Sequence, residues 1–242
     1  PSSDPRTYSP PVIYRYTTFQ EEANPQAITL FQELVHVISN HKQGIYEYIM
    51  DWYANLIQTP FDNSKTSLIL SGRKGCGKDT LGDLIQEWVI GDLYCHNYTS
   101  TAQFWEKHDC DRLNKLLVKL EEASRYVNGK YASDMKARIT ARTLTVNPKG
   151  KGSITSSNYV RYIMTTNEGD GVKIEEEDRR YLLISCGADW VGNREKWNEI
   201  RSVLFSPSGA KAIGEWLMTR NIKGWVSTNF PENEYCLLYT SD

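Results

Sequence analysis

The chain has 242 residues, 40% of them hydrophobic and 24% charged, which is the composition of one large globular domain. No apolar run approaches the length of a membrane span, so we predict no transmembrane helix and no membrane as partner. The formal net charge of −2 excludes a generally basic nucleic-acid binder, and any such binding requires a local cluster of cations. Five irregularly spaced cysteines are interpreted as reduced thiols of an intracellular protein.

The N-terminal quarter divides into two parts. Residues 1–24 are rich in proline, serine and charged side chains and are predicted to be a linker or tail. Residues 25–64 are predicted to form a helical segment, because apolar side chains recur every three or four positions over 25–38 and again over 45–57.

A glycine-rich loop follows the apolar run at 68–70, which predicts a buried strand. Gly72, Gly77 and Lys78 have the spacing of a phosphate-binding loop, in which backbone N–H groups and the lysine surround phosphate oxygens. Asp79 stands where such loops have a Ser or Thr that binds magnesium, so Asp79 and Thr80 are both candidate ligands. The residues expected to bind the nucleotide are Gly72, Gly75, Cys76, Gly77, Lys78, Asp79 and Thr80.

The remaining elements alternate between helices and strands. In chain order we predict a helix at 81–89 ended by Gly91, a short strand at 92–95, a short helix with Thr101 as N-cap, a strand at 113–120, a helix at 131–140, a strand at 143–146, a turn at 148–152, strands at 159–166 and 181–185, helices at 194–205 and 208–219, and a tail over 221–242. This alternation predicts an α/β sheet with the phosphate loop at the carboxyl end of a strand.

Two glutamates follow the apolar run at 113–120. Magnesium prefers oxygen ligands, and a carboxylate can also orient an attacking water. Because neighbouring strand residues point to opposite faces, Glu121 and Glu122 can take these two roles only if the strand ends at this point. Taken alone, the pair is as well explained as two solvated charges.

Polar residues border two further strands. Asn167 ends the run at 159–166, where its amide can hydrogen-bond a γ-phosphate or a water, although asparagine at a strand end also forms turns. Arg179 and Arg180 precede the strand at 181–185. Either arginine can act on a nucleotide held by a neighbouring subunit, and the alternative is a surface salt bridge.

A stretch without acidic residues lies between Asp134 and Glu168. Lys149 and Lys151 flank Gly150 at the tip of a predicted hairpin, and a loop with two cations suits contact with the backbone of a single-stranded nucleic acid. The basic residues of this stretch are Lys136, Arg138, Arg142, Lys149, Lys151 and Arg161.

Together these motifs resemble those of a superfamily 3 helicase, of the viral or phage (poxvirus-like) primase-helicase type, in order and spacing over about residues 45–220. The resemblance implies an AAA+-like P-loop ATPase core at 65–220, with a β-hairpin before the sensor strand. It also implies ATP and Mg²⁺ as cofactors, single-stranded DNA as partner and a ring, usually a hexamer. A primase domain often precedes this core, and the location would be the host cytoplasm or nucleus for a viral protein.

The resemblance also implies roles for individual residues. Lys78 would bind the β- and γ-phosphates, Glu121 would serve magnesium and Glu122 would polarise water. Asn167 would sense phosphate, and either Arg179 or Arg180 would reach the adjacent subunit. Lys149 and Lys151 would grip DNA.

Two other classes share parts of this pattern. The sequence Gly77-Lys78-Asp79-Thr80 resembles the loop of some nucleoside monophosphate kinases, although the long helical segment before the loop and the basic hairpin have no role there. A loader that binds ATP without hydrolysing it is the third class, and Asp79 is the reason to consider it.

Overall fold

The computed structural model describes residues 12–106, 110–167, 169, 171–175 and 178–231. Its main sheet has five strands in the order β2-β3-β6-β1-β7, and every neighbouring pair is parallel. These strands are β1 (Ser67–Ser71), β2 (Cys95–Tyr98), β3 (Leu117–Glu121), β6 (Arg161–Thr166) and β7 (Tyr181–Ser185). A separate antiparallel pair consists of β4 (Thr143–Val146) and β5 (Ile154–Ser157), and it confirms the predicted hairpin.

Helices connect and cover these strands. The α-helices are α1 (Pro25–Ile38), α2 (Gln43–Gln58), α3 (Lys78–Asp83), α4 (Thr101–Phe104), α5 (Ser124–Val127), α6 (Ala132–Thr140), α7 (Arg194–Leu204) and α8 (Pro207–Thr219). The 3₁₀ segments are η1 (Arg15–Thr18), η3 (Asp92–Tyr94) and η4 (Gly129–Tyr131), and η2 (Leu84–Ile90) is a π-helix. None of the described helices is both long enough and apolar enough to cross a membrane.

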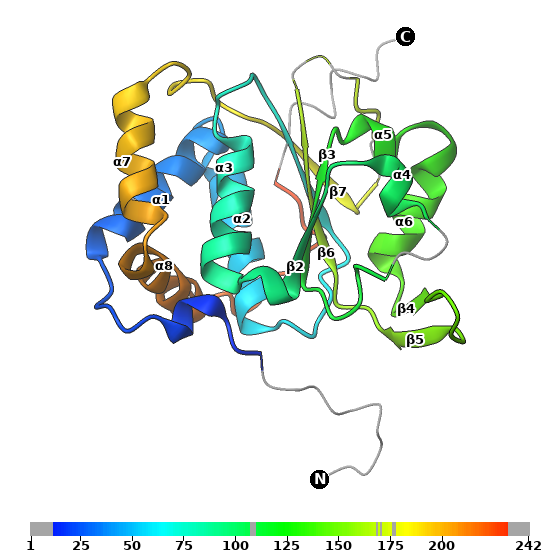
Figure 1. Ribbon diagram of the computed structural model, residues 1–242. Coiled ribbons are helices and arrows are strands. Elements are labelled where there is room, and N and C mark those ends of the chain that lie inside the picture. Colours follow the sequence, from blue (N-terminus) through cyan, green and yellow to red (C-terminus); the bar gives the residue numbers. More distant parts are fainter. Residues whose placement is uncertain (1–11, 107–109, 168, 170, 176–177, 232–242) are drawn as a thin grey trace.

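The sheet is covered on both faces (Figure 1). One layer contains α1, α2, α3, α7 and α8, and the other contains α4, α5 and α6. Alternation along β1 explains the arrangement: Leu68 and Leu70 join the core of the first layer, whereas Ile69 joins the core of the second. A parallel sheet buried on both faces requires the continuous apolar runs from which the strands were predicted.

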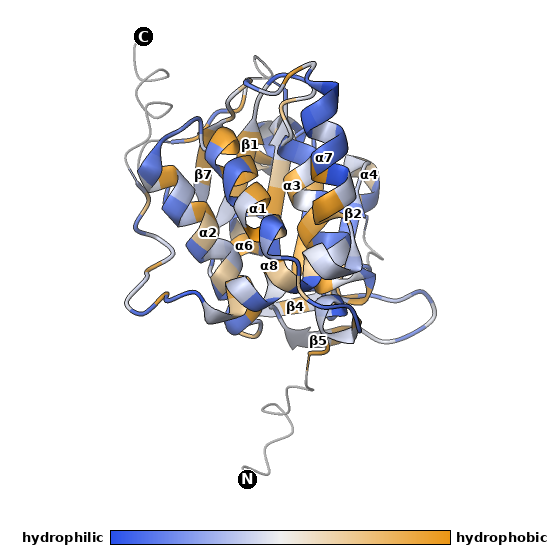
Figure 2. Cartoon of the chain, turned by 90° about the vertical axis from the view of Figure 1, so that its left-hand side faces the viewer, coloured by the Kyte–Doolittle hydropathy of each residue, from blue (hydrophilic) through white to orange (hydrophobic). Residues whose placement is uncertain are grey.

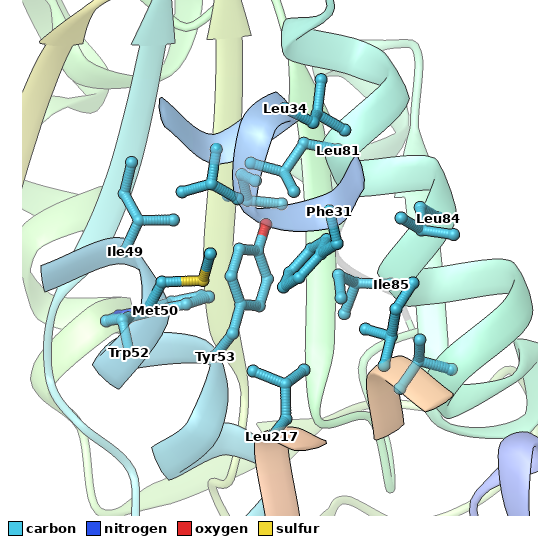
Figure 3. Close-up of a cluster of buried hydrophobic side chains, with 14 of the residues drawn as sticks. Phe31, Leu34, Ile49, Met50, Trp52, Tyr53, Leu81, Leu84, Ile85 and Leu217 are labelled. Atoms are coloured by element: carbon cyan, nitrogen blue, oxygen red, sulfur yellow. The ribbon is translucent and has the colours of Figure 1, made fainter. Parts of the chain in front are cut away.

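The larger core lies between the sheet and the first layer. Phe31 of α1, Tyr53 of α2 and Leu81 of α3 meet there, and Leu217 of α8 closes the cluster (Figure 3). The apolar stripes of these helices point inward and their polar faces point outward (Figure 2). The predicted helical segment at 25–64 therefore packs directly on β1, the strand that leads into the glycine-rich loop.

The chain segments that border the core also pack on it. Tyr16 of η1 is buried beside Gly214 of α8, within the region predicted to be a linker. At the other end, Trp225 and Phe230 lie on the ring of Tyr48, at centroid distances of 5.6 Å and 5.4 Å. The rest of the predicted linker and tail, residues 1–11 and 232–242, lies outside the described residues.

Several predicted element bounds are wrong for local reasons. The segment at 92–95 is mostly the 3₁₀ turn η3, because Leu93 faces solvent with 73% of its surface exposed. The strand predicted from 113 starts at Leu117, because Asn114 has a left-handed backbone with φ of 59°. The helix predicted at 81–89 starts at Lys78 and continues as the π-helix η2, because apolar spacing does not distinguish α from π geometry.

The short helix α4 differs from the prediction at its first residue. Thr101 is the first helical residue, Ser100 occupies the N-cap position, and no side chain caps the helix.

Candidate functional site

The pocket that gathers the predicted site residues lies at the carboxyl ends of β1, β3 and β6. These three strands are neighbours and parallel, so the residues that follow them meet at one edge of the sheet. The pocket has a volume of about 250 Å³. It is lined by Lys78, Asp79, Glu121, Glu122, Thr165, Thr166 and Asn167.

The glycine-rich loop turns sharply before the pocket. Gly75 and Gly77 have φ of 84° and 100°, which only glycine adopts without cost. Gly77 is restricted twice, because a Cβ atom at this position would lie 2.6 Å from the Trp197 ring of α7. At the start of the loop, the Gly72 N–H donates to the Thr166 carbonyl at 3.2 Å, which joins the loop to the end of β6.

Lys78 is the cation of the pocket and is only 5% exposed. Its Nζ donates to Asn167 Oδ1 at 3.4 Å and lies 3.7 Å from Asp79 Oδ2. A buried ammonium group with one amide and one partly exposed carboxylate beside it retains capacity for an anion. Thr80, the alternative magnesium ligand, is half-buried on α3 and is not among the described residues that line the pocket.

Glu121 and Glu122 separate in direction where β3 ends. Glu121 is the last strand residue, and Glu122 has a left-handed backbone with φ of 59°. A non-glycine residue in this region is uncommon and often marks a functional position. The strand β3 therefore ends between Glu121 and Glu122, as is required if the two carboxylates are to take different roles.

The two carboxylates have different neighbours. Glu122 Oε2 is 2.5 Å from Arg125 Nε, one helical turn further along the chain. Glu121 Oε1 lies 4.0 Å from Lys119 Nζ, which is buried. Lys119 in turn is 2.5 Å from Asp83 Oδ1 of α3. This ion pair, in which Lys119 is buried and Asp83 is partly exposed, joins β3 to α3, the helix that follows the glycine-rich loop.

Sequence reasoning assigned no role to Thr165 and Thr166, which line the pocket, or to Lys119, which lies beside Glu121. Thr165 and Thr166 end β6 and are 3% and 4% exposed, and the Thr165 carbonyl accepts from the Ala123 N–H at 3.0 Å. Polar residues directly before Asn167 were a signal for them, because they follow the apolar part of the same strand. Lys119 is a cation within an apolar run, a pattern that Arg161 of β6 shares.

The donor set of the pocket fits a magnesium-bound nucleotide. Three carboxylates, two hydroxyls and one amide supply oxygen atoms of the kind that Mg²⁺ prefers, and Lys78 supplies the charge that phosphate requires. Glu121 and Asp79 are the residues that would hold the metal, and Gly75, where a Cβ atom would meet nothing within 4 Å, leaves room for phosphate oxygens to approach the backbone.

Arg179 and Arg180 lie at the opposite edge of the sheet. The Arg180 carbonyl accepts from the Ser67 N–H at the start of β1, so the length of a strand, roughly 15 Å, separates both arginines from the pocket. Arg180 is tied to Asp178, with Nη1 3.1 Å from Oδ1. Arg179 is exposed and has no ion pair or hydrogen bond within the described part of the chain.

Asp178 anchors this edge of the sheet. Its side chain is 1% exposed and also lies 2.8 Å from Lys136 Nζ of α6. Burial by itself raises the pKa of Asp178, but hydrogen bonds from Lys136 and Arg180 outweigh it and hold the pKa below the usual value. Hydrogen bonds to Asp178 and to Glu175 raise the pKa of Lys136.

The hairpin is on the same side of the molecule as these arginines (Figure 1). Lys149 and Lys151 are exposed at its tip, on both sides of Gly150 with φ of 74°. Lys136 and Arg161, two other cations of the basic stretch, do not belong to an exposed basic patch. Lys136 is bound to Asp178 and Glu175.

Arg161 is fully buried and donates to the backbone carbonyls of Thr59, Pro60 and Asp62, where it fixes the end of α2 to β6. Burial lowers its pKa to about 10. The expectation that Arg161 contributes to a nucleic-acid surface is therefore wrong.

Comparison with known proteins finds similarity to a phage replication protein. Residues 70–180 match the profile of a family of unknown function, DUF5906. The DNA primase-polymerase of Nitratiruptor phage NrS-1 is 26% identical over 196 residues, which cover 77% of this chain and 27% of that protein.

Solved structures of the NrS-1 C-terminal region have a similar fold. The apo structure of its residues 305–718 has a TM-score of 0.72 and 22% identity, covering 90% of this chain and 54% of that one. An A-form apo structure of the same region has a TM-score of 0.66 and 21% identity, covering 84% and 47%. The chain spans about a quarter of the full-length relative and about half of its C-terminal region. It is thus homologous to part of the NrS-1 primase-polymerase and shares the fold of that protein's C-terminal region.

Proposed function

We propose that this chain is an ATP-hydrolysing motor domain of a phage-type replication protein, a superfamily 3 helicase that acts on single-stranded DNA. The observation that carries the proposal is the convergence of Lys78, Glu121, Glu122 and Asn167 from three strand ends into one pocket. A cation, two carboxylates and an amide at one sheet edge are the groups that phosphoryl transfer to water requires.

Within this pocket different residues of the chain bind the phosphates, orient Lys78 and hold the metal. The N–H groups of the loop and the Lys78 ammonium bind the β- and γ-phosphates, and Asn167 keeps the lysine directed into the pocket through its 3.4 Å contact. A bound Mg²⁺ supplies additional positive charge to the phosphate oxygens, and Glu121 and Asp79 are the residues that hold it.

Glu122 orients the attacking water. Its left-handed backbone takes the side chain out of the alternation that a continued strand would give, and Glu122 lines the pocket. Arg125 holds the carboxylate in the present arrangement, and this ion pair is exposed on both sides, so releasing it costs little.

The positive charge that completes the site comes from a second subunit. Neither Arg179 nor Arg180 can reach the pocket of its own chain, because a strand length separates them from it. The amino edge of one subunit would then pack against the pocket of the next, which is a head-to-tail contact. Such contacts close into a ring, and we propose a hexamer. We assign the finger to Arg179, because Arg180 is already held by Asp178.

The relatives support a role in replication. The protein that matches over most of this chain is named a DNA primase-polymerase, and the matched part is only 27% of its length. We therefore propose that this domain works beside a primase or polymerase domain, in the phage-infected cell. Lys149 and Lys151 contact the DNA backbone from the exposed hairpin.

The test is ATP hydrolysis by the purified chain with and without single-stranded DNA. We expect DNA to stimulate turnover and Lys78→Ala to abolish it, whereas Lys223→Ala, an exposed lysine outside the pocket, leaves it unchanged. Turnover that ignores DNA and passes phosphate to a nucleoside monophosphate would identify a kinase instead. Tight ATP binding without turnover would identify a loader.

A further inference from the structure

Two cysteine side chains meet beneath the phosphate loop. Cys76 belongs to the loop, and Cys186 directly follows β7. A Cβ atom placed on Gly72 would lie 2.9 Å from Cys76 Sγ and 2.8 Å from Cys186 Cβ, so both side chains approach the same point and the two thiols are hydrogen-bonded. Neither side chain has a role in the nucleotide chemistry described above.

The two thiols are electrostatically unequal. The hydrogen bond from Cys186, together with the Lys78 N–H and ammonium, lowers the pKa of Cys76 to about 6. The same hydrogen bond and burial raise the pKa of Cys186 well above its usual value. At neutral pH a thiolate therefore lies beside a protonated thiol, which is the arrangement of an attacking and a resolving cysteine.

The backbone is held more firmly at Cys186 than at Cys76. Cys186 is fixed by the sheet, because its N–H donates to the Ser71 carbonyl at 2.7 Å. Cys76 lies in the loop next to Gly75, where a Cβ atom would meet nothing within 4 Å, so the loop has room to shift on that side. When the two sulfurs approach each other, it is the loop that shifts.

We propose that Cys76 and Cys186 form a reversible disulfide that switches off the phosphate loop. A peroxide is the oxidant: the Cys76 thiolate attacks one peroxide oxygen, the O–O bond breaks, and Cys76 becomes a sulfenic acid. The departing hydroxide takes up the proton that the Cys76 thiol had released and leaves as water. The Cys186 sulfur then attacks the Cys76 sulfur and expels a second water. Two thiols and one hydrogen peroxide thus give one disulfide and two waters.

The effect on nucleotide binding rests on the proposed function. A disulfide holds its sulfurs about 2.05 Å apart, closer than a hydrogen bond between thiols, so Cys76 is drawn toward β7 and the N–H groups of the loop lose their common direction. Both thiols are buried, so the peroxide enters only when the loop opens. Bound nucleotide holds the loop closed and slows oxidation, and by reciprocity the disulfide weakens nucleotide binding.

The first experiment measures the disulfide alone. The reduced full chain is treated with hydrogen peroxide, and its unreduced peptides are mapped by mass spectrometry. We expect a Cys76–Cys186 linked peptide that lacks two hydrogens and disappears on reduction. Cys76→Ser and Cys186→Ser should remove it, and Cys110→Ser, at a half-buried cysteine elsewhere, should retain it. Oxidation of Cys110 with Cys76 and Cys186 left as free thiols would overturn the proposal.

The second experiment compares ATP affinity before and after oxidation. We expect ATP affinity to be about 10-fold weaker in the disulfide form and to recover fully on reduction. We also expect the disulfide to form more slowly when ATP is present. A linked peptide with unchanged affinity would overturn the switch. A chain that binds no nucleotide in either form would refute the proposed function, while the peptide map would still decide whether the disulfide forms.

Discussion

The two edges of the sheet differ in whether their charged side chains have partners within the same chain. At the carboxyl edge, Lys78, Asn167 and the carboxylates face one another in a pocket, and buried Lys119 pairs with partly exposed Asp83 beside them. At the amino edge, Arg179, Lys149 and Lys151 point outward without an ionic partner among the described residues. The charged groups of the carboxyl edge thus contact one another within the chain, and the exposed cations of the amino edge do not.

Because of this contrast, we expect mutations at the two edges to have different effects. Substitutions in the pocket should reduce chemistry in every subunit on its own. Substitutions at the exposed amino edge should act only where a neighbour or a DNA strand is bound, and they should leave nucleotide affinity unchanged. The predictions below test that division.

The largest effect is expected at the exposed arginine. Arg179→Ala should lower the rate of ATP turnover by about 10³-fold, because an arginine finger neutralises charge that develops on the transferred phosphate. Turnover under saturating ATP is the measurement. Arg201→Ala, an exposed arginine on α7, is the control and should stay within about twofold. A normal rate in Arg179→Ala would show that this edge does not complete the site.

The next effect is expected at Glu122. Glu122→Gln should lower turnover by about 10²- to 10³-fold with ATP affinity retained, because the amide cannot accept the proton from the water. Single-turnover hydrolysis and ATP titration separate the two quantities. Arg125→Ala provides the control, because it frees Glu122 from its ion pair and should change the rate by less than about threefold. Equal losses in both variants would assign Glu122 a structural role.

The sequence anticipated the carboxyl edge better than the supports behind it. Glu121 and Asn167 each follow an apolar run, and parallel strands bring such positions to one edge whatever their order. The neighbours of each strand, by contrast, depend on the whole fold. The contact of Lys119 with Asp83 and the burial of Arg161 were therefore not predictable from local pattern, and Arg161 was placed on the wrong surface.

A smaller effect is expected at the hairpin. The double variant Lys149→Ala/Lys151→Ala should bind single-stranded DNA about tenfold more weakly and reduce the slope of log affinity against log salt by about 1.4, because two phosphate contacts are lost. Fluorescence anisotropy at several salt concentrations measures both values. The matched control is Lys173→Ala/Lys223→Ala, two exposed lysines outside the hairpin. An unchanged salt slope would remove the hairpin from the DNA contact.

A change in stability rather than activity is expected at Asp178. Asp178→Asn should lower the free energy of unfolding at pH 7 by about 3 kcal/mol, because Lys136 and Arg180 lose a buried carboxylate. The folded-state pKa of Asp178 is depressed, so its stabilisation is complete above the usual value of 3.8 and is lost as pH falls below it.

Urea unfolding at pH 7 and near pH 3 measures this difference, which should shrink at the lower pH. Glu175→Gln removes the exposed partner of the same lysine and should cost less than about 1 kcal/mol at pH 7. Equal costs for the two variants would contradict the anchoring role of Asp178.

The most direct test of the account mixes two inactive variants, Lys78→Ala and Arg179→Ala. In a head-to-tail ring, an Arg179→Ala subunit retains an intact pocket and a Lys78→Ala subunit retains an intact arginine. An equal mixture should therefore recover up to about a quarter of the wild-type ATPase rate, since about a quarter of the interfaces combine both intact parts. A mixture no more active than the separate variants would contradict a site shared between subunits.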